Sequence, residues 1–177
     1  MTEFCLASVS LDLGPLVVLL QPPGTRLLSL PSGSGYPPLG LYQLAATVPS
    51  GLAMVLDAAG LGLDKAQTRA MLRALRPRHP RLVGMMSTAD TLPMVEEYAA
   101  ACGFLGISVL VCGPHASLSP RDVFMKCPTV EYVVRGSAVA VFPEILGRLA
   151  VHASLRGLPG LCFQHGDRKL HLEPAVS

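Results

Sequence analysis

Residues 107–115 of the chain read Ile107-Ser108-Val109-Leu110-Val111-Cys112-Gly113-Pro114-His115, an apolar run of strand length followed by a small, glycine-containing turn. The same arrangement recurs along the chain. The turns that follow apolar runs are Pro37-Pro38-Leu39-Gly40, Asp57-Ala58-Ala59-Gly60, Ser87-Thr88-Ala89-Asp90, Cys112-Gly113-Pro114-His115 and Arg135-Gly136-Ser137-Ala138. Continuous apolar strands are typical of a parallel sheet that is covered on both faces. In such a sheet, right-handed crossovers bring all these turns to one edge, where ligands bind.

Strand and helix signals alternate between these turns. Strands are expected at 16–20, 53–56, 82–86, 107–111 and 130–134, and helices at about 39–47, 64–75, 91–103, 119–127 and 140–155. Asp64 is expected to cap the second helix, and Gly103 to end the third. Residues 160–163 and 169–172, with a polar turn between them, indicate a β-hairpin. The sequence therefore predicts an α/β fold with a five-stranded parallel sheet, helices on both faces and a C-terminal hairpin.

Composition favours one folded domain. The chain has 177 residues, of which 50% are hydrophobic and 15% charged, a composition that can bury a core and does not indicate disorder. We expect a single domain over residues 1–177, with a core at about 16–157 and the hairpin at about 158–174. The net charge of +2, spread along the chain, gives no electrostatic reason to expect nucleic acid or an anionic membrane. No apolar run reaches the length of a membrane span, and Glu3 and Asp12 do not suit a secretory signal.

The cysteines give no sign of a metal cluster. Their positions are Cys5, Cys102, Cys112, Cys127 and Cys162. The spacings are wide, with no Cys-x-x-Cys pattern and no iron–sulfur cluster pattern. We expect reduced thiols that act as small core residues in a cytoplasmic protein. Cys112 and His115 form a lone Cys-x-x-His without further zinc ligands at readable spacing, and we interpret it as a turn.

Several enzyme classes are disfavoured by the turns themselves. The first turn contains no phosphate-binding glycine motif, and Gly33-Ser34-Gly35 leads into prolines, which have no amide hydrogen to offer a phosphate. The chain also lacks Gly-x-Ser-x-Gly, and none of its histidines pairs obviously with a nucleophile and an acid. Nucleotide-dependent and hydrolytic activities are therefore not expected.

An ordered set of motifs is more specific. The segments are Leu19-Leu20-Gln21-Pro22-Pro23, then 37–46, Met54-Val55-Leu56-Asp57-Ala58, 82–88, 109–116 and 132–137. In this order, over about Leu16 to Leu172, the chain resembles the cobalamin-binding domain found at the N-terminus of many cobalamin-dependent radical S-adenosylmethionine enzymes. The resemblance implies a flavodoxin-like, Rossmann-like sheet. It also implies that cobalamin lies across the edge formed by the turns, with its nucleotide tail against the sheet.

The first turn departs from the corrinoid domains in which a histidine binds the cobalt. Those domains carry Asp-x-His-x-x-Gly before the first helix, where this chain has Gly35-Tyr36-Pro37-Pro38-Leu39-Gly40. Pro37 stands in the place of the histidine and has no donor atom for cobalt. The resemblance therefore implies base-off cobalamin without a protein imidazole, its lower face covered or flanked by Tyr36, Pro37 and Leu39. Pro38 is equally well explained as a proline that starts a helix.

The third and fourth turns are expected to contact the nucleotide tail. The turn at Ser87 and Thr88 matches a polar turn beside the benzimidazole pocket, although Met86 stands where many relatives have serine. These hydroxyls, with Asp90, could instead cap a helix. The turn at 112–115 resembles a Gly-Gly-Pro-His turn in which a glycine allows close approach of the tail. His115 would bond a tail phosphate or ribose, or else be a surface group.

The fifth turn, 135–138, resembles an Arg-Gly-Glu-Gly turn in which Ser137 and Ala138 replace the last two residues. Arg135 would contact the cofactor or, alternatively, form an ion pair with Asp57, a carboxylate that we expect to stabilise its own turn. The cofactor-binding residues implied by the resemblance are Tyr36, Pro37, Pro38, Leu39, Gly40, Leu44, Met86, Ser87, Thr88, Ala89, Cys112, Gly113, Pro114, His115, Arg135, Gly136 and Ser137.

Three functions are compatible with this reading. The chain has neither the length nor the cysteine spacing of the radical barrel, so we expect no radical chemistry from it alone. It would be a cobalamin-binding module, stand-alone or excised, that works beside a catalytic partner. Alternatively it is a cobalamin-responsive regulator or carrier. The third alternative is an interaction domain whose pocket is closed by Cys112, Ser137 and Ala138.

Overall fold

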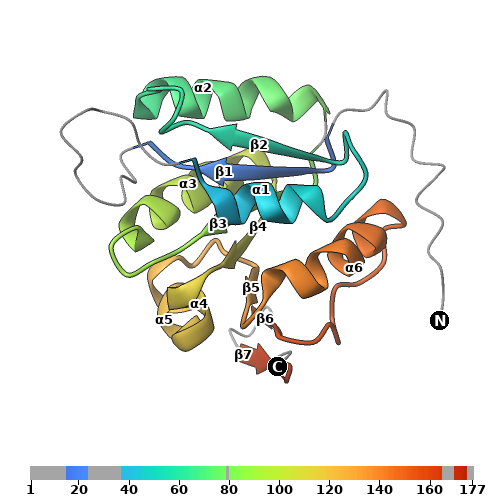
Figure 1. The fold of residues 1–177 in the computed structure, drawn as a ribbon. Helices are drawn as coiled ribbons and strands as arrows, with labels where there is room; N and C mark the ends of the chain where they lie inside the picture. Colours follow the sequence, from blue (N-terminus) through green and yellow to red (C-terminus); the bar gives the residue numbers. More distant parts are fainter. Residues whose placement is uncertain (1–14, 24–36, 79, 165–169, 175–177) are drawn as a thin grey trace.

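A single sheet with helices on both faces organises the chain (Figure 1). The computed structural model describes residues 15–23, 37–78, 80–164 and 170–174. Its strands are β1 (Val17–Gln21), β2 (Ala53–Asp57), β3 (Leu82–Met86), β4 (Ser108–Cys112), β5 (Tyr132–Val134), β6 (Leu161–Gln164) and β7 (Leu170–Leu172), in the order β2-β1-β3-β4-β5-β6-β7. Strands β1 to β5 pair in parallel. The α/β class and the mostly parallel sheet are thus confirmed.

The strand count of the sheet was predicted wrongly. The C-terminal hairpin is part of the sheet, because β6 pairs antiparallel with β5 (Val133 beside Cys162) and β7 pairs antiparallel with β6 (Cys162 beside Leu172). Among the described residues, the sheet is therefore mixed and has seven strands. An edge strand leaves a row of backbone groups unpaired, and β6 satisfies that row on β5 while burying Leu161. The hairpin pattern in the sequence carried no information about which edge it would join.

Helices cover the sheet in two layers. They are α1 (Leu39–Ala46), α2 (Lys65–Leu75), the 3₁₀ turn η3 (Arg76–Arg78), α3 (Leu92–Leu105), α4 (Pro114–Leu118), α5 (Pro120–Lys126) and α6 (Ala138–Ala150). On one face α1 and α6 pack on Val17 and Leu19 of β1, whereas α2, α3, α4 and α5 lie on the other with Val18 and Leu20. Each central strand is thus buried on both sides, which explains its unbroken apolar run.

The cap predicted for α2 is confirmed, whereas the predicted ends of α3 and α6 were wrong. Asp64 caps α2 as predicted, since its carboxylate accepts the N–H of Gln67 (2.7 Å) and Gln67 Oε1 accepts the N–H of Asp64 (2.9 Å). Gly103 does not end α3, however. The helix runs to Leu105 and ends at Gly106, whose φ of 71° is left-handed. Likewise, α6 ends at Ala150 rather than near residue 155. A glycine costs a helix interior only about 1 kcal/mol, which the packing of α3 outweighs.

The cysteines behave as predicted wherever the structure describes them. Cys102, Cys112, Cys127 and Cys162 are unpaired and buried. Burial raises the pKa of the Cys102, Cys112 and Cys127 thiols to about 12, and that of Cys162 to about 11. These thiols are therefore uncharged core groups at neutral pH. Cys5 lies outside the described residues.

The parallel register brings the turns to one edge of the sheet. Gln21 lies beside Asp57 at the ends of β1 and β2, and Met86 lies beside Cys112 at the ends of β3 and β4. We call the edge where β1 to β5 end the carboxyl edge. Because β2 and β3 flank β1 on opposite sides, the chain reverses its winding there, the position where open α/β sheets bind ligands. Among the described residues, no helix is long and apolar enough to cross a bilayer.

Candidate functional site

The first turn of α1 lies against the end of β3. A Cβ built at Gly40 would lie 2.5 Å from Sδ of Met86 and 2.8 Å from its Cε, so any larger residue at position 40 would displace the Met86 side chain. Leu44, one turn further along α1, is 2% exposed and lies in the core between α1 and the sheet. The structure thus brings Gly40 and Met86 together at the carboxyl edge, with Leu44 beneath them.

The prolines before α1 form its start. Pro38 is the N-cap residue of α1, and its carbonyl oxygen accepts the N–H groups of Leu41 (2.9 Å) and Tyr42 (3.2 Å). Pro38 therefore stands at the start of α1, which is the alternative role that the sequence suggested for it. Pro37 is exposed, and Leu39 exposes 66% of its surface. Tyr36 lies outside the described residues.

Ser87 is the most unusual residue of this edge. Its backbone is fixed, because its N–H donates to the carbonyl of Cys112 (2.8 Å) and its carbonyl accepts the N–H of His115 (3.2 Å). The residue is fully buried, yet its Oγ has no hydrogen-bond partner within the described part of the chain. A buried hydroxyl without a partner costs about 1–3 kcal/mol. Ser87 therefore does not use its side chain as a helix cap.

The neighbouring hydroxyls do satisfy one another. Thr91 is the N-cap residue of α3, and its Oγ1 accepts the N–H of Thr88 (2.9 Å) and contacts Thr88 Oγ1 (3.2 Å). Ala89 and Asp90 are exposed in the same turn. The side-chain helix cap that the sequence suggested for this turn is therefore not formed, because Thr91 bonds back to Thr88 rather than to the first amides of α3.

Gly113 allows the turn after β4 to pack against the turn after β3. Its φ is 105°, and a Cβ built on it would lie 2.8 Å from the Ser87 carbonyl oxygen and 3.1 Å from the Ser87 nitrogen. The glycine is needed because two backbone turns touch here. Cys112 points into the core shared by α1 and α6 and is 1% exposed, while Pro114 begins α4.

His115 is held by a carboxylate. Its Nε2 lies 2.9 Å from Oδ2 of Asp122 on α5, and Nζ of Lys126 donates to the same oxygen at 3.1 Å. The hydrogen bond from Lys126, followed by that from His115, holds the pKa of Asp122 below its ordinary value. The imidazole is thus oriented by a carboxylate, a pairing that the sequence analysis did not find because Asp122 follows on another helix.

The fifth turn is bound to the fourth through Ser117, which the sequence analysis also missed. Ser117 Oγ donates to the carbonyl of Gly113 (2.9 Å) and accepts the N–H of Gly136 (3.0 Å). Arg135 is half-buried; its N–H donates to Gly160 (2.8 Å), but its Nε is buried with no partner in the described chain. Ser137 is the exposed N-cap residue of α6. A serine in a short helix carries no sequence signal for such a bridging role.

The ion pair considered between Arg135 and Asp57 was wrong. Strands β2 and β5 are separated by β1, β3 and β4, so their ends lie about 19 Å apart at the usual strand spacing. Asp57 instead accepts the N–H of Gly60 (2.8 Å), the turn-stabilising role expected for it. The turns after β3, β4 and β5 are therefore joined to each other, and the β2 turn is remote from them. The described residues contain no cluster of His, Cys, Asp or Glu suited to a metal ion.

Comparison with curated sequences finds methyltransferases. No family model matches the chain. An uncharacterized methyltransferase of Pyrococcus horikoshii, PH0819, is 29% identical over 163 residues, covering 89% of this chain and 34% of the relative. The 2-(S-pantetheinyl)-carbapenam-3-carboxylate methyltransferase of Streptantibioticus cattleyicolor is 35% identical over 71 residues, which are 40% of this chain and 10% of that enzyme. The matched part of this chain thus spans about a third of the first relative and a tenth of the second.

Solved structures share the fold. The radical S-adenosylmethionine methyltransferase TsrM of Kitasatospora setae, solved with cobalamin and a [4Fe-4S] cluster, matches with a TM-score of 0.72 and 19% identity, over 92% of this chain and 29% of TsrM. The cobalamin-dependent radical enzyme OxsB, solved with aqua-cobalamin and S-adenosylmethionine, matches with a TM-score of 0.67 and 13% identity, over 94% of this chain and 23% of OxsB. Both neighbours are radical S-adenosylmethionine enzymes that were solved with cobalamin bound.

Proposed function

We propose that this chain is a cobalamin-binding module and that the cofactor lies across the carboxyl edge. The observation that carries the proposal is the fold match, because over nine-tenths of the chain superposes on proteins that were solved with cobalamin bound. When bound, cobalamin supplies a cobalt centre that carries a methyl or other upper ligand. The protein's part is to hold the cofactor and to set access to both of its faces.

The residues at the carboxyl edge fit such a ligand. Ser87 Oγ and Arg135 Nε are buried polar atoms without partners among the described residues. Both of their turns are bonded to the turn after β4, the Ser87 turn through backbone hydrogen bonds and the Arg135 turn through Ser117. Cobalamin carries amides, a ribose and a phosphate on its periphery and tail. A serine hydroxyl and a guanidinium N–H can bond to these groups and so offset the cost of their burial. Cys112 does not close the site, because its side chain lies in the core.

The lower face of the cobalt would receive no nitrogen from the described part of the chain. Pro37 occupies the position of the ligating histidine. His115 is bound to Asp122, His152 contacts Arg81, and His171 stacks on Phe163 with ring centroids 4.9 Å apart. The proline at position 37, which has no donor atom for cobalt, supports base-off binding without a protein imidazole. We further propose that the module works beside a catalytic partner or within a longer polypeptide, since its curated relatives are several times longer.

The visible spectrum of cobalamin tests the proposal. Purified protein mixed with hydroxocobalamin should keep the chromophore through desalting, with a base-off spectrum. The variant Pro37→His should change this spectrum to that of imidazole-ligated cobalamin, because it restores a donor at the matching position. Pro37→Ala is the control and should leave the spectrum base-off. Loss of all chromophore on desalting, or an imidazole-ligated spectrum in the unaltered protein, would contradict the proposal.

A further inference from the structure

A groove of about 420 Å³ lies between α2 and α3, on the outer surface of the layer opposite α1 and α6. Leu72 and Arg73 of α2 line one side, and Ala100, Ala101, Phe104 and Leu105 of α3 line the other. The two alanines have short side chains, so α3 leaves room there that larger residues would fill. The groove is therefore apolar at its base and walled by longer side chains.

One wall of the groove exposes an aromatic ring. Phe104, on α3, exposes 92% of its surface. Burying a phenylalanine side chain contributes about 1.5–3 kcal/mol, so leaving this ring in water forgoes a large stabilisation. Exposed aromatic residues beside small pockets are typical anchors of protein–protein interfaces. Phe104 therefore gives this groove an exposed apolar anchor on which a partner side chain can pack.

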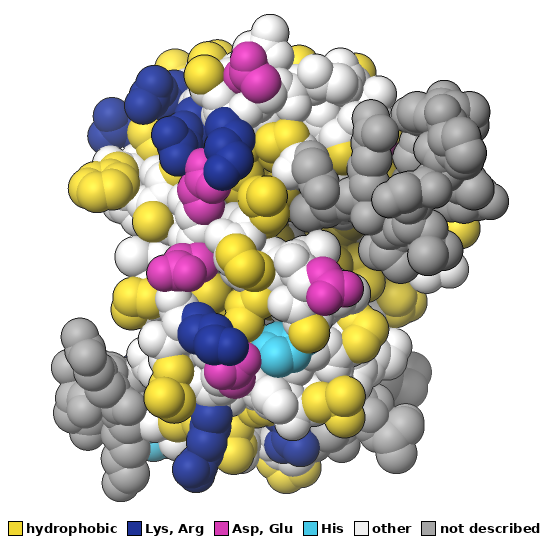
Figure 2. All heavy atoms as spheres, turned by 90° about the vertical axis from the view of Figure 1, so that its left-hand side faces the viewer, with side chains coloured by type: hydrophobic (Ala, Val, Ile, Leu, Met, Phe, Trp, Pro, Cys, Tyr) yellow, Lys and Arg dark blue, Asp and Glu magenta, His cyan; other side chains and the backbone are white. Residues whose placement is uncertain are grey.

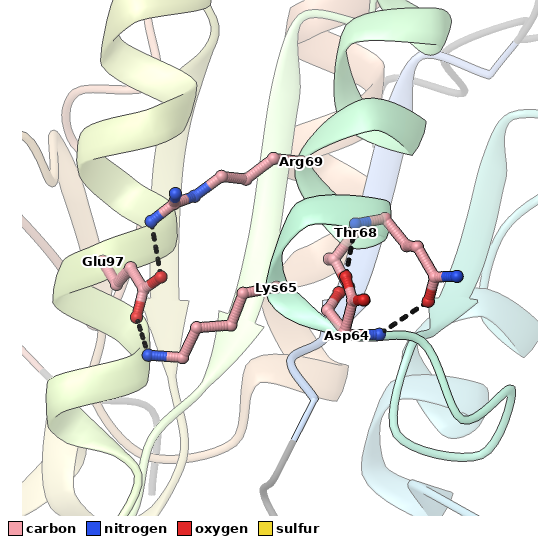
Figure 3. Close-up of polar contacts among 6 residues, drawn as sticks. Asp64, Lys65, Thr68, Arg69 and Glu97 are labelled. Atoms are coloured by element: carbon pink, nitrogen blue, oxygen red, sulfur yellow. Dashed lines mark hydrogen bonds and ion pairs between the residues drawn. The ribbon is translucent and has the colours of Figure 1, made fainter.

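The other wall is cationic. In Figure 2, Lys and Arg side chains gather over α2, which lies at the top of Figure 1. Glu97 of α3 accepts bonds from Lys65 (2.7 Å) and Arg69 (2.5 Å), as Figure 3 shows, so the carboxylate that lines the groove is already shared by two cations. The next arginines along the chain are exposed and make no ion pair with any described residue. They are Arg73, Arg76 and Arg78.

The groove points away from the proposed cofactor. Both α2 and α3 start at the carboxyl edge and return to the opposite edge, since β3 and β4 begin there. Arg73 and Phe104 lie in the later turns of these helices. A partner in the groove would therefore leave the carboxyl edge open.

We propose that this groove docks an acidic amphipathic helix of a partner protein. Its apolar side chains would pack on Ala101 and Phe104, and its carboxylates would face Arg73, Arg76 and Arg78. A third helix is the natural occupant of a groove between two helices. A second copy of this chain fits poorly, because a two-fold contact through this surface would bring like charges together. This proposal does not depend on cobalamin binding.

Fluorescence anisotropy with a labelled synthetic peptide tests the proposal. The probe has leucines at helical spacing on one face and glutamates on the other, and a matched peptide carries lysine for every glutamate. The acidic peptide should bind, more weakly as salt rises, whereas the basic peptide should not. Phe104→Ser and Arg73→Glu should each weaken binding at least about tenfold. Met125→Ser, which alters a methionine that is 82% exposed on α5, is the matched control and should have no effect.

Two further measurements make the result decisive. Phe104→Ser and Met125→Ser should keep the melting temperature of the unaltered chain, because both side chains are exposed. Arg73→Glu reverses a charge in the last turn of α2 and should lower the melting temperature by only a few degrees. Each variant should also retain cobalamin to the same extent, so that failure of one proposal is distinguishable from failure of the other. No binding of the acidic peptide, or equal losses in Phe104→Ser and Met125→Ser, would overturn the proposal. A dimer in sedimentation equilibrium that Phe104→Ser dissociates would overturn it in favour of a second copy.

Discussion

The turns of the carboxyl edge and the outer surface of the helices differ in whether their polar side chains have hydrogen-bond partners. At the carboxyl edge, Ser87 Oγ and Arg135 Nε are buried without partners in the part of the chain that the structure describes. On the helices, the carboxylates of Glu97 and Asp122 are partly exposed, yet each is shared by two basic side chains. Water could have satisfied the exposed carboxylates in any case, whereas nothing in the described chain satisfies the buried atoms. Of the three buried side-chain polar atoms that lack a partner among the described residues, two therefore lie at the carboxyl edge, and the third is Tyr98 Oη of α3.

The contact that holds the carboxyl-edge turns together gives the largest expected effect. Gly113→Ala combines a φ of 105° with a Cβ placed 2.8 Å from a backbone oxygen that cannot easily move. We expect a loss of about 3 kcal/mol in the free energy of unfolding, measured by urea denaturation. Gly157→Ala is the matched control, because its φ is 77° but no atom lies within 4 Å of the built Cβ. It should cost about 1 kcal/mol, and equal costs would show that the turn contact is unimportant.

The unpartnered hydroxyl should separate stability from binding. Ser87→Ala removes a buried group that has no partner, so the free energy of unfolding without ligand should stay the same or rise by about 1 kcal/mol. Retention of hydroxocobalamin should nevertheless fall. Ser108→Ala is the control at the opposite edge of the sheet, where the hydroxyl bonds to Glu131 (3.0 Å). A loss of stability in Ser87→Ala with unchanged cobalamin retention would refute the contrast between the two regions.

The exposed carboxylates should give the smallest effect, and it should depend on pH. Because the pKa of Asp122 in the folded chain is lower than its ordinary value of 3.8, its ionised form stabilises the fold above that pH. This contribution is lost as the pH falls through the lowered folded value. Asp122→Asn should therefore shift the urea midpoint slightly at neutral pH and not at all in strong acid. A difference that persists unchanged in acid would exclude this ion pair as its cause.

The sequence predicted those features that local chemistry determines. Apolar runs such as Val109-Leu110-Val111, followed by small turns, indicate buried parallel strands wherever they occur, and Asp64 with Gln67 is a capping pattern readable from spacing alone. The contacts between elements were not predictable in this way. Ser117, which bonds to Gly113 and Gly136, and Asp122, which holds His115, act across turns and helices that only the folded chain brings together. The pairing of β6 with β5 likewise depends on tertiary structure and not on local sequence.

The antiparallel hairpin protects the strands that carry the proposed site. Without it, β5 would end the sheet and offer its backbone to strands of other molecules. With it, the outermost strand on that side is β7, which spans only Leu170–Leu172 and is too short to template a long intermolecular ladder. A shortened chain that lacks β6 and β7 would therefore expose the edge of β5, and we expect it to be less soluble.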